Sequence, residues 1–439
     1  MAIQYFPAAL QPIIQQGFLE REFEDGLKSV LAYRQAAKRE MFATNIGETL
    51  TKTRPGLKAP ITTPMAPSGN TNLDNGLSAS TWTVEQYTLT LAMYGDTIDL
   101  NTVTQKVGIK SQFMQNAKAN GIQAAQSLDR LARNKLFGAY MGGNTRVTAT
   151  LGAPAATIAV DDITGFTTVL VAGVPTPVST TNKLDVSVNG TVYHLQSNTV
   201  DSPNTSTAFN GVSGTLTFSG NVTVANGTTG NSVVSVYAPK ILRPNARATQ
   251  NAVTSSDTLS MSIVLDAVAL LRSNAVPSIN GMYNVHLDPI SGRQLFADPD
   301  FKIAYQGQAA SQEFRMGRVI ELLDCRFIPT TEAPIQAHPT TAGLNVRRPI
   351  VVGEGALIEG DFSGMENSDF TDNDAEVNLV DQVVQVTRPP LDRLQQIIAQ
   401  SWYWIGDFAA PTDFTVNSTI VPTASAAYLK RACVIEHAG

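Results

Sequence analysis

Small and apolar side chains recur at helical spacing over one long segment without proline, residues 106–140. They fall on or near one stripe, which comprises Phe113, Ala117, Gly121, Ala124, Leu128, Leu131, Lys135 and Ala139. At 1.5 Å per residue such a helix would be about 50 Å long. Because most of the stripe is small, a sheet or another helix can approach it closely. Gly142 and Gly143 are expected to end the helix.

The segment before this helix has the opposite character. Of the 38 residues from 49 to 86, 18 are Thr, Pro, Gly or Asn. Polar loops longer than about 15 residues are uncommon in compact domains and are usually functional or disordered. We expect neighbouring copies of the chain to order this loop. The alternation of Tyr87, Leu89, Leu91 and Met93 then predicts a strand, with a bend or bulge at Gly95.

An N-terminal arm, residues 1–47, precedes the loop. Phe23, Leu27, Val30 and Leu31 fall at helical spacing, which predicts an amphipathic helix over residues 18–42. Two interpretations stay open at this point. The helix packs on its own body, or it reaches a neighbouring copy.

Residues 145–245 change in composition and predict an inserted all-β domain. Only eight of them are charged, and Val, Thr, Ser, Asn and Gly dominate. Asn189-Gly190 between two alternating runs is a strong signal for a β-hairpin. Further strands are predicted at residues 216–218, 222–224 and 233–236.

Mixed structure is predicted after residue 245. A helix capped at Ser256 or Asp257 carries Leu259, Ile263, Ala267 and Leu270. A strand at residues 283–287 is followed by a short helix that begins at Pro289. Long strands are predicted at residues 319–328, 350–358 and 377–386, and residues 394–408 form a long apolar segment.

The charge content limits the possible partners. Charged residues make up 15% of the 439 residues, which suits large protein contacts. The net charge of −6 argues against tight nucleic-acid binding by the whole surface. One basic face is nevertheless predicted on the long helix, either solvated or facing a polyanion such as DNA, and it comprises Lys106, Lys110, Lys118, Arg130, Arg133 and Lys135. No signal peptide or membrane-spanning run is found, so a soluble intracellular product is expected.

The sequence offers little catalytic chemistry. Cys325 and Cys433 are expected to be reduced core residues, and His286, Asp288 and Cys325 form at best a weak thiol site. No phosphate-binding, dinucleotide-binding or serine-nucleophile motif is present. We therefore expect no enzyme activity, cofactor or metal.

An acidic run leaves three interpretations open. It could hold a divalent ion, lie in a solvated loop, or pair with Arg54 or Lys58 of another copy, and it comprises Asp369, Asp372, Asp374 and Glu376.

The order of these parts resembles the major capsid protein of tailed bacteriophages, of the Hong Kong 97 type, and in particular the branch that includes the phage N4 coat protein. The local patterns that carry the resemblance lie at residues 47–57, 94–98, 283–289, 317–331, 352–357 and 388–392. The resemblance implies an α+β fold in six parts. These are the arm (1–47), the extended loop and return strand (48–100), the spine helix (101–144), the inserted β domain (145–245), the axial domain with long peripheral strands (246–390), and the closing strands (391–439).

The resemblance also implies a function. Pentamers and hexamers would form the icosahedral head shell of a virion, assembled in the host cytoplasm. The implied partners are other copies of the chain, a separate scaffolding protein, a portal, a decoration or cement protein and, by weak contact, double-stranded DNA; no membrane is implied. Candidate contact residues between copies are Phe23, Leu27, Arg54, Lys58, Trp82, Asp372 and Asp374. Candidate hinges are Gly47, Gly95, Gly108, Gly142 and Gly143.

Two alternatives are an encapsulin-like shell protein, which has the same fold, and a phage tail, decoration or adhesin β protein. Some relatives join their subunits by a Lys–Asn crosslink. Lys52 and Lys58 are the available loop lysines, but no catalytic partner is evident, so no crosslink is expected.

Overall fold

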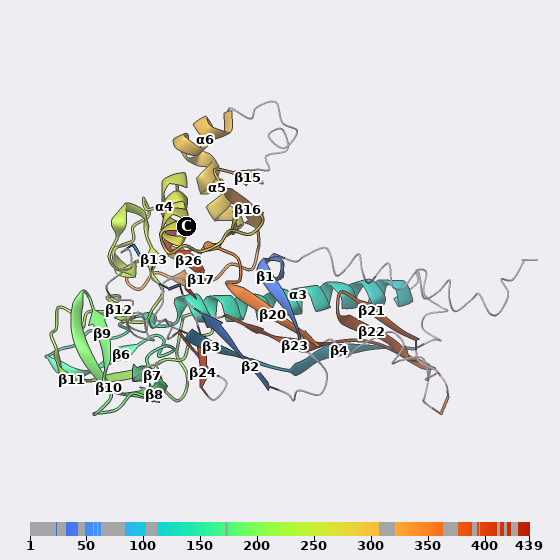
Figure 1. The fold of residues 1–439 in the computed structure, drawn as a ribbon, viewed down its shortest axis with the longest axis horizontal. Coiled ribbons are helices and arrows are strands. Elements are labelled where there is room, and N and C mark those ends of the chain that lie inside the picture. Colours follow the sequence, from blue (N-terminus) through green and yellow to red (C-terminus); the bar gives the residue numbers. More distant parts are fainter. Residues whose placement is uncertain are drawn as a thin grey trace, which may run out of the picture. The chain divides into compact units, whose positions relative to one another are not determined.

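The computed structural model describes most of the chain: residue 23 and residues 32–42, 49–55, 57–58, 60–62, 84–101, 112–171, 174–306, 321–362, 376–388, 393–394, 396–410, 413–416, 419–422 and 429–439. The chain forms two compact units. Figure 1 labels its helices and strands. Unit 1 combines Met1–Leu50, Leu89–Leu136 and Leu357–Ala409, and unit 2 combines Thr51–Thr88, Phe137–Ala356 and Ala410–Gly439. Several candidate residues lie outside the described residues: Leu27, Gly47, Trp82, Lys106, Gly108, Lys110, Asp372 and Asp374.

The predicted long helix is present as α3 (Gln112–Met141), and it ends at Gly142 and Gly143 as expected. In unit 1 its buried face is built largely from small residues, including Ala117, Ala124 and Ala125. This face lets the helix lie close to a strand, because the Asn120 amide donates to the Gln400 carbonyl at 3.1 Å. The Trp402 indole likewise donates to Gln123 at 3.2 Å.

One long strand organises the sheet of unit 1. This strand, β23 (Ile397–Ala409), pairs with β4 (Ala92–Asn101) along one edge. Its other edge pairs first with β22 (Val383–Arg388) and then with β20 (Leu357–Phe362). The outer strands are β21 (Glu376–Val380) beside β22 and β1 (Ala37–Phe42) beside β20. Alternate residues of β23 are buried, as expected for a strand with one face on a core.

Unit 1 corrects the prediction for the arm. Residue 23 is helical, but the predicted helix over residues 18–42 does not continue to its end. A short 3₁₀ helix, η1 (Arg34–Ala36), leads into β1, which pairs in parallel with β20 over six residues. Pairing with β20 therefore makes the last six residues of the predicted helix a strand. The predicted bend at Gly95 is also wrong, because Gly95 lies inside the regular β4 ladder; β3 (Val84–Thr90) and β4 separate at Leu91.

Three segments that were each predicted as one strand form two strands in the structure. Residues 319–328 contain β15 (Glu321–Leu322) and β16 (Cys325–Pro329), which form a hairpin around Leu323 and Asp324. Residues 377–386 fall in β21 and β22, which turn at Asp381 and Gln382. All four turn residues have positive φ, between 50° and 66°. Residues 350–358 divide into β19 (Ile350–Val352) and β20 around a glycine turn.

A six-stranded mixed sheet carries the main core of unit 2. Its order is β13-β26-β19-β14-β16-β15. The strands not yet bounded are β13 (Ile241–Leu242), β14 (Tyr283–Leu287) and β26 (Ala432–Ile435). The core joins this sheet to α4 (Met261–Ser273), α5 (Pro289–Ala297) and α6 (Pro299–Gln306). A second sheet of three strands comprises β17 (Ile335–Ala337), β18 (Asn345–Arg347) and β27 (His437–Ala438).

The helix caps of unit 2 were predicted in part. Pro289 is the first residue of α5, as predicted, and the Asp288 side chain caps this helix. The cap of α4 differs, because Asp257 lies in the preceding turn and accepts from the Thr254 amide at 2.7 Å. The backbone amide of Met261, the first residue of α4, instead donates to the Asp298 side chain at 2.6 Å. Asp298 lies at the C-terminal end of α5. A cap supplied by a distant segment has no local sequence signal.

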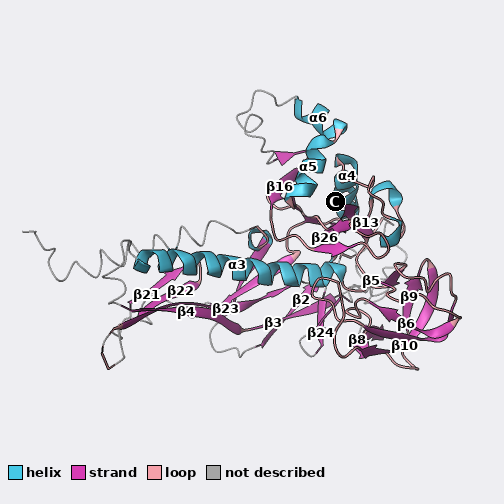
Figure 2. Cartoon of the chain, turned by 180° about the vertical axis from the view of Figure 1, so that it is seen from behind, coloured by secondary structure: helices cyan, strands magenta, loops and turns pink. Residues whose placement is uncertain are grey.

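The inserted segment forms a closed six-stranded barrel in unit 2. Its order is β5-β12-β9-β10-β11-β6, and Val147 of the β5 end bridges Val160 in β6. The strands are β5 (Asn144–Arg146), β6 (Ala155–Val160), β9 (Leu184–Val188), β10 (Thr191–Val200), β11 (Gly214–Val222) and β12 (Ser232–Ser235). Closure leaves no free sheet edge, and the core inside is separate from that of the neighbouring sheet. Figure 2 shows strands and loops, and no helix, among the described residues of the barrel.

The predicted hairpin at Asn189-Gly190 is confirmed. These two residues connect β9 and β10, and their φ values are 49° and 87°. Both positive angles are those that an Asn-Gly turn between twisted strands requires.

Three short ladders complete the described structure. They are β2 (Thr49–Pro55) with β3, β7 (Thr168–Val171) with β8 (Val174–Pro177), and β24 (Asp413–Val416) with β25 (Thr419–Pro422). Among the described helices, none is both long and apolar enough to cross a bilayer.

Candidate functional site

The root of the N-terminal arm is fixed in unit 1 by one carboxylate of α3. Asp129 Oδ1 accepts hydrogen bonds from the backbone amides of Ala32, Tyr33 and Arg34, at 3.0, 2.7 and 3.1 Å. The Asp129 side chain is buried. Burial raises its pKa, although the three amides favour the ionised form. Three consecutive amides aimed at one oxygen hold the chain in the turn that leads into β1.

Arg34 adds a second anchor at the same place. Its Nε donates to Glu359 Oε1 at 2.8 Å, and its NH1 lies 3.0 Å from Asp381 Oδ2. Arg39 pairs with Asp381 Oδ1 at 2.7 Å. Arg34 and Glu359 are buried, so each charge needs the other to offset its lost hydration.

Sequence reasoning missed these anchors of the arm. Asp129 was visible only as the lone acid on a basic helix. No local pattern links it to residues 95 or more positions earlier. Among the candidate contacts in the arm, Phe23 is fully buried in the structure.

The base of the extended loop is held within unit 2. Arg54 in β2 donates from NH1 to the Gly355 carbonyl at 2.9 Å. Arg431 donates from NH1 to the neighbouring Glu354 carbonyl at 2.9 Å. Gly355 has a φ of 70°, and a Cβ there would meet the two guanidinium groups at about 3 Å. Arg54 therefore has a role inside its own chain, whereas Lys58 is exposed.

The basic side chains of α3 are not a uniform charged face. Lys118 and Arg130 are exposed, whereas Arg133 and Lys135 are half-buried. Lys135 lies 3.4 Å from Asp407 Oδ1. Arg133 donates to the Asn134 side chain at 3.1 Å. Part of the positive charge is thus used in contacts within unit 1.

Three hinge candidates fall in the described structure. Gly95 lies opposite Tyr403 in the sheet, and a Cβ there would come within 2.5 Å of the Trp402 carbonyl. Gly143 donates to the Thr164 carbonyl at 2.7 Å and accepts from Ser235 at 2.8 Å. Gly142, which precedes it, is buried. Movement at the Gly142-Gly143 pair would break both bonds of Gly143, so the hinge role stays a prediction.

A Ser, a His and an Asp side chain lie together in unit 2, but their hydrogen-bond pattern is that of a structural cluster. Ser291 Oγ lies 2.7 Å from His437 Nε2 and donates to Asp288, and Asp288 also accepts from Arg347 at 2.6 Å. In an acyl-transfer triad the acid would orient the histidine, not the serine. All four side chains are buried, and burial lowers the pKa of His437 to about 4. The cluster fastens β27 to the first turn of α5.

The other predicted thiol and imidazole groups are also buried. Burial raises the pKa of the Cys325 thiol to about 11 and that of Cys433 to about 12. Burial lowers the pKa of His286 to about 3. These groups are thus held in their neutral forms at pH 7. No group of three or more His, Cys, Asp or Glu side chains in the described part of the chain is placed to hold a metal ion.

Comparison with known proteins gives a match by structure alone. No protein-family model and no curated protein matches the chain. The capsid of Ralstonia phage GP4 is similar, with a TM-score of 0.50 and 10% identity over 94% of this chain and 92% of that chain. The Cyanophage P-SCSP1u capsid has a TM-score of 0.48 and 10% identity, over 93% and 88% of the two chains. The Cyanophage Pam1 capsid has a TM-score of 0.44 and 11% identity, over 100% and 95%.

The match to the GP4 capsid extends over almost the whole length of both chains. It does not favour a separate tail or adhesin β protein. At 10% identity the likeness concerns the fold. The chain has the α+β fold of a bacteriophage capsid protein.

Proposed function

We propose that this chain is the major capsid protein of a tailed bacteriophage, of the Hong Kong 97 type. Its copies form pentamers and hexamers, and these close into the icosahedral shell that encloses the phage DNA. The observation that carries the proposal is the full-length structural match to the GP4 capsid, 94% of one chain on 92% of the other. A match confined to one unit would have left the rest of the chain free for another role.

The order of the elements supports the Hong Kong 97 assignment. An arm, an extended loop, the α3 helix and an axial part with mixed strands follow one another as in the family that the sequence resembles. In this proposal the arm and the extended loop reach neighbouring copies. Leu27 in the arm and Trp82 in the loop are contact residues, together with the exposed Lys58 of the loop. Asp372 and Asp374 are contact residues in the axial part, residues 246–390.

The anchors in the structure favour contact between copies through the arm and the extended loop. Asp129 and Arg34 fix the chain where the arm leaves unit 1, and Arg54 fixes the base of the loop on unit 2. Segments that must reach another copy gain precision when their roots are rigid, because less conformational entropy is lost on contact. Heterologous contacts of this kind generate closed rings and shells.

The proposed partners follow from the same function. They are other copies of this chain, a separate scaffolding protein, a portal and a cement protein. Packaged DNA would make weak contact with the exposed Lys118 and Arg130. The net charge of −6 and the internal use of Lys135 favour weak contact over tight binding.

Electron microscopy of the purified full-length chain, with sedimentation velocity alongside, tests the proposal. Closed shells, tubes, or rings of five and six copies are the expected particles. A monodisperse monomer or dimer, obtained even when the scaffolding candidates from the same genome are coexpressed, would overturn it.

A matched pair of charge reversals tests the role of the loop. Lys58→Glu lies in the extended loop, and Lys183→Glu lies on the barrel; both lysines are exposed. We expect Lys58→Glu to reduce the yield of particles and Lys183→Glu to leave it unchanged, with both variants folded by circular dichroism. Equal yields would contradict the proposed loop contact.

A further inference from the structure

The barrel of unit 2 closes along one short seam. There the Asp161 amide donates to the Arg146 carbonyl at 3.1 Å, and the Thr148 amide donates to the Ala159 carbonyl at 3.0 Å. The neighbouring strands β9 and β10 are paired over five residues, and β10 and β11 are also extensively paired. Segments with few backbone hydrogen bonds open first in a folded protein. The seam is therefore a weaker join than these two ladders.

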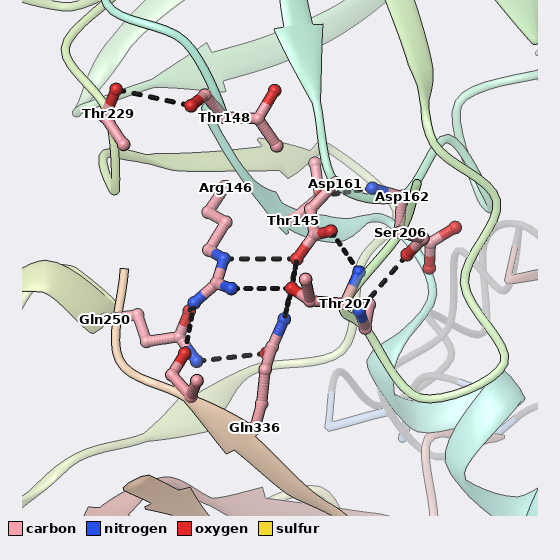
Figure 3. Close-up of polar contacts among 12 residues, drawn as sticks. Thr145, Arg146, Thr148, Asp161, Asp162, Ser206, Thr207, Thr229, Gln250 and Gln336 are labelled. Atoms are coloured by element: carbon pink, nitrogen blue, oxygen red, sulfur yellow. Dashed lines mark hydrogen bonds and ion pairs between the residues drawn. The ribbon is translucent and has the colours of Figure 1, made fainter. Parts of the chain in front are cut away.

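An ion pair crosses this seam. Arg146 ends β5, Asp161 directly follows β6, and Arg146 Nε lies 3.1 Å from Asp161 Oδ2 (Figure 3). Thr207, also within the inserted segment, bonds both partners. Its amide and hydroxyl donate to Asp161 at 2.7 Å each, and Arg146 NH2 donates to its Oγ1 at 2.7 Å.

The remaining bonds of this pair come from outside the barrel. Gln336 of β17 donates from Nε2 to Asp161 Oδ2 at 2.6 Å. Gln250 of η4 (Gln250–Ala252) accepts from Arg146 NH1 at 3.0 Å, and the Ala337 carbonyl accepts from the same nitrogen at 2.9 Å. Gln250 in turn donates to Gln336 at 3.2 Å. Figure 3 shows both glutamine side chains pointing toward the Arg146–Asp161 pair.

Burial makes these outside bonds necessary. Arg146 is 9% exposed and Asp161 is 2% exposed. A buried ion pair is stable only when further hydrogen bonds satisfy its remaining donors and acceptors. Thr207 supplies part of this requirement, and Gln250, Gln336 and the Ala337 carbonyl supply the rest.

The network extends to the C-terminal strands. Arg348 donates to Gln336, and its Nε donates to Glu436 at 3.0 Å. Arg243, just after β13, donates to the other oxygen of Glu436 at 2.8 Å. A network of buried charged side chains thus connects the seam to the main sheet of unit 2.

We propose that the seam is a latch, in which closure of the barrel between β5 and β6 depends on Gln250 and Gln336 of the surrounding chain. The latch couples the inserted barrel to β17 and η4. A shift of β17 away from the barrel opens the seam and exposes the edges of β5 and β6. Unpaired strand edges can pair with another chain.

Hydrogen–deuterium exchange on the full-length protein tests the latch. The substitution Gln336→Leu lies outside the barrel, and the readout is the exchange of the seam peptides that contain the Thr148 and Asp161 amides. Loss of a hydrogen bond to a buried charge predicts about tenfold or faster exchange at the seam. The β9–β10 ladder serves as the internal reference and should stay within about twofold.

The matched control is Ile335→Val on the same strand, because Ile335 is half exposed whereas Gln336 is buried. Unchanged seam exchange in Gln336→Leu would overturn the proposal, and so would an equal increase at the seam and in the β9–β10 ladder. If Gln336→Leu does not fold, Gln250→Leu decides by the same readout. Gln250→Leu removes the hydrogen bond that Gln250 accepts from Arg146 and the one that it donates to Gln336.

Discussion

Replacing Asp129 by alanine should free the root of the N-terminal arm. The substitution removes the one oxygen that accepts from the amides of Ala32, Tyr33 and Arg34. A buried amide left without an acceptor costs about 1–3 kcal/mol, so three of them cost about 3–9 kcal/mol. The cost is reduced by the burial of the carboxylate, which raises its pKa and is relieved when the charge is removed. A net loss of about 3 kcal/mol corresponds to roughly 100-fold easier local opening.

Asparagine at the same position is the matched control. Asp129→Asn keeps an oxygen where the three amides point and removes only the charge. A raised pKa in the folded chain means that ionisation opposes folding. That cost is absent below the unfolded pKa, grows as the pH rises through the folded pKa, and is fully present above the folded pKa. We therefore expect Asp129→Asn to lie within about 1 kcal/mol of the native chain.

Hydrogen–deuterium exchange of the peptide covering residues 32–36 measures this opening directly. Asp129→Ala should exchange about 100-fold faster at these amides than the native chain, and Asp129→Asn less than about tenfold faster. Native-like exchange in Asp129→Ala would refute the reasoning, because it would mean that β1 alone holds the arm root. Equal acceleration in both variants would show that the charge, and not the acceptor oxygen, is what matters.

Three further predictions follow from buried groups and close packing. Cys325 and Cys433 should not react with an aromatic disulfide reagent at pH 8 until the protein is denatured, because burial raises their thiol pKa values to about 11 and about 12; a native thiol titre would contradict this. Burial lowers the pKa of His437 from 6.5 to about 4, so the neutral imidazole contributes about 3 kcal/mol of stability above pH 6.5 that is lost as the pH falls toward 4. His437→Gln should therefore flatten the pH dependence of the melting temperature. Parallel curves of melting temperature against pH for the variant and the native chain would argue against this assignment. Gly95→Ala should destabilise the chain by about 2–4 kcal/mol, because its Cβ meets a backbone carbonyl at 2.5 Å, whereas Gly220→Ala, with open space, should change the melting temperature little; similar shifts for both would refute the packing argument.

Turn chemistry explains which hairpins were predictable. Asn189-Gly190 carries residues that tolerate positive φ, and the hairpin there was predicted correctly. Leu323-Asp324 adopts the same kind of backbone without a glycine, so residues 319–328 were predicted as one strand. The native conformation at Leu323 is imposed by the pairing of β15 with β16, which no local pattern contains.

The polar anchors were largely beyond sequence reasoning. Periodicity identified α3 and its small-residue face because those signals repeat every few residues. Asp129 and Arg34 act on partners 95 or more residues away. Gln336 and Asp161 are 175 residues apart, and no sequence pattern near either residue predicts their contact. Buried polar partners of this kind depend on the tertiary arrangement alone.

The chain enters and leaves the barrel at neighbouring points. Asn144 in β5 is the ladder partner of Val234 in β12, and the Ser235 amide donates to the Gly143 carbonyl at 2.8 Å. Paired residues on antiparallel strands lie about 5 Å apart, a gap that a short turn can span. For the rest of the protein, some ninety residues of barrel therefore occupy the place of a single tight connection. Evolution could add, lose or exchange such a module without rerouting the host backbone, and a designer could put another domain there, provided that the polar side chains left facing it, Gln250 and Gln336, are given new partners or made apolar.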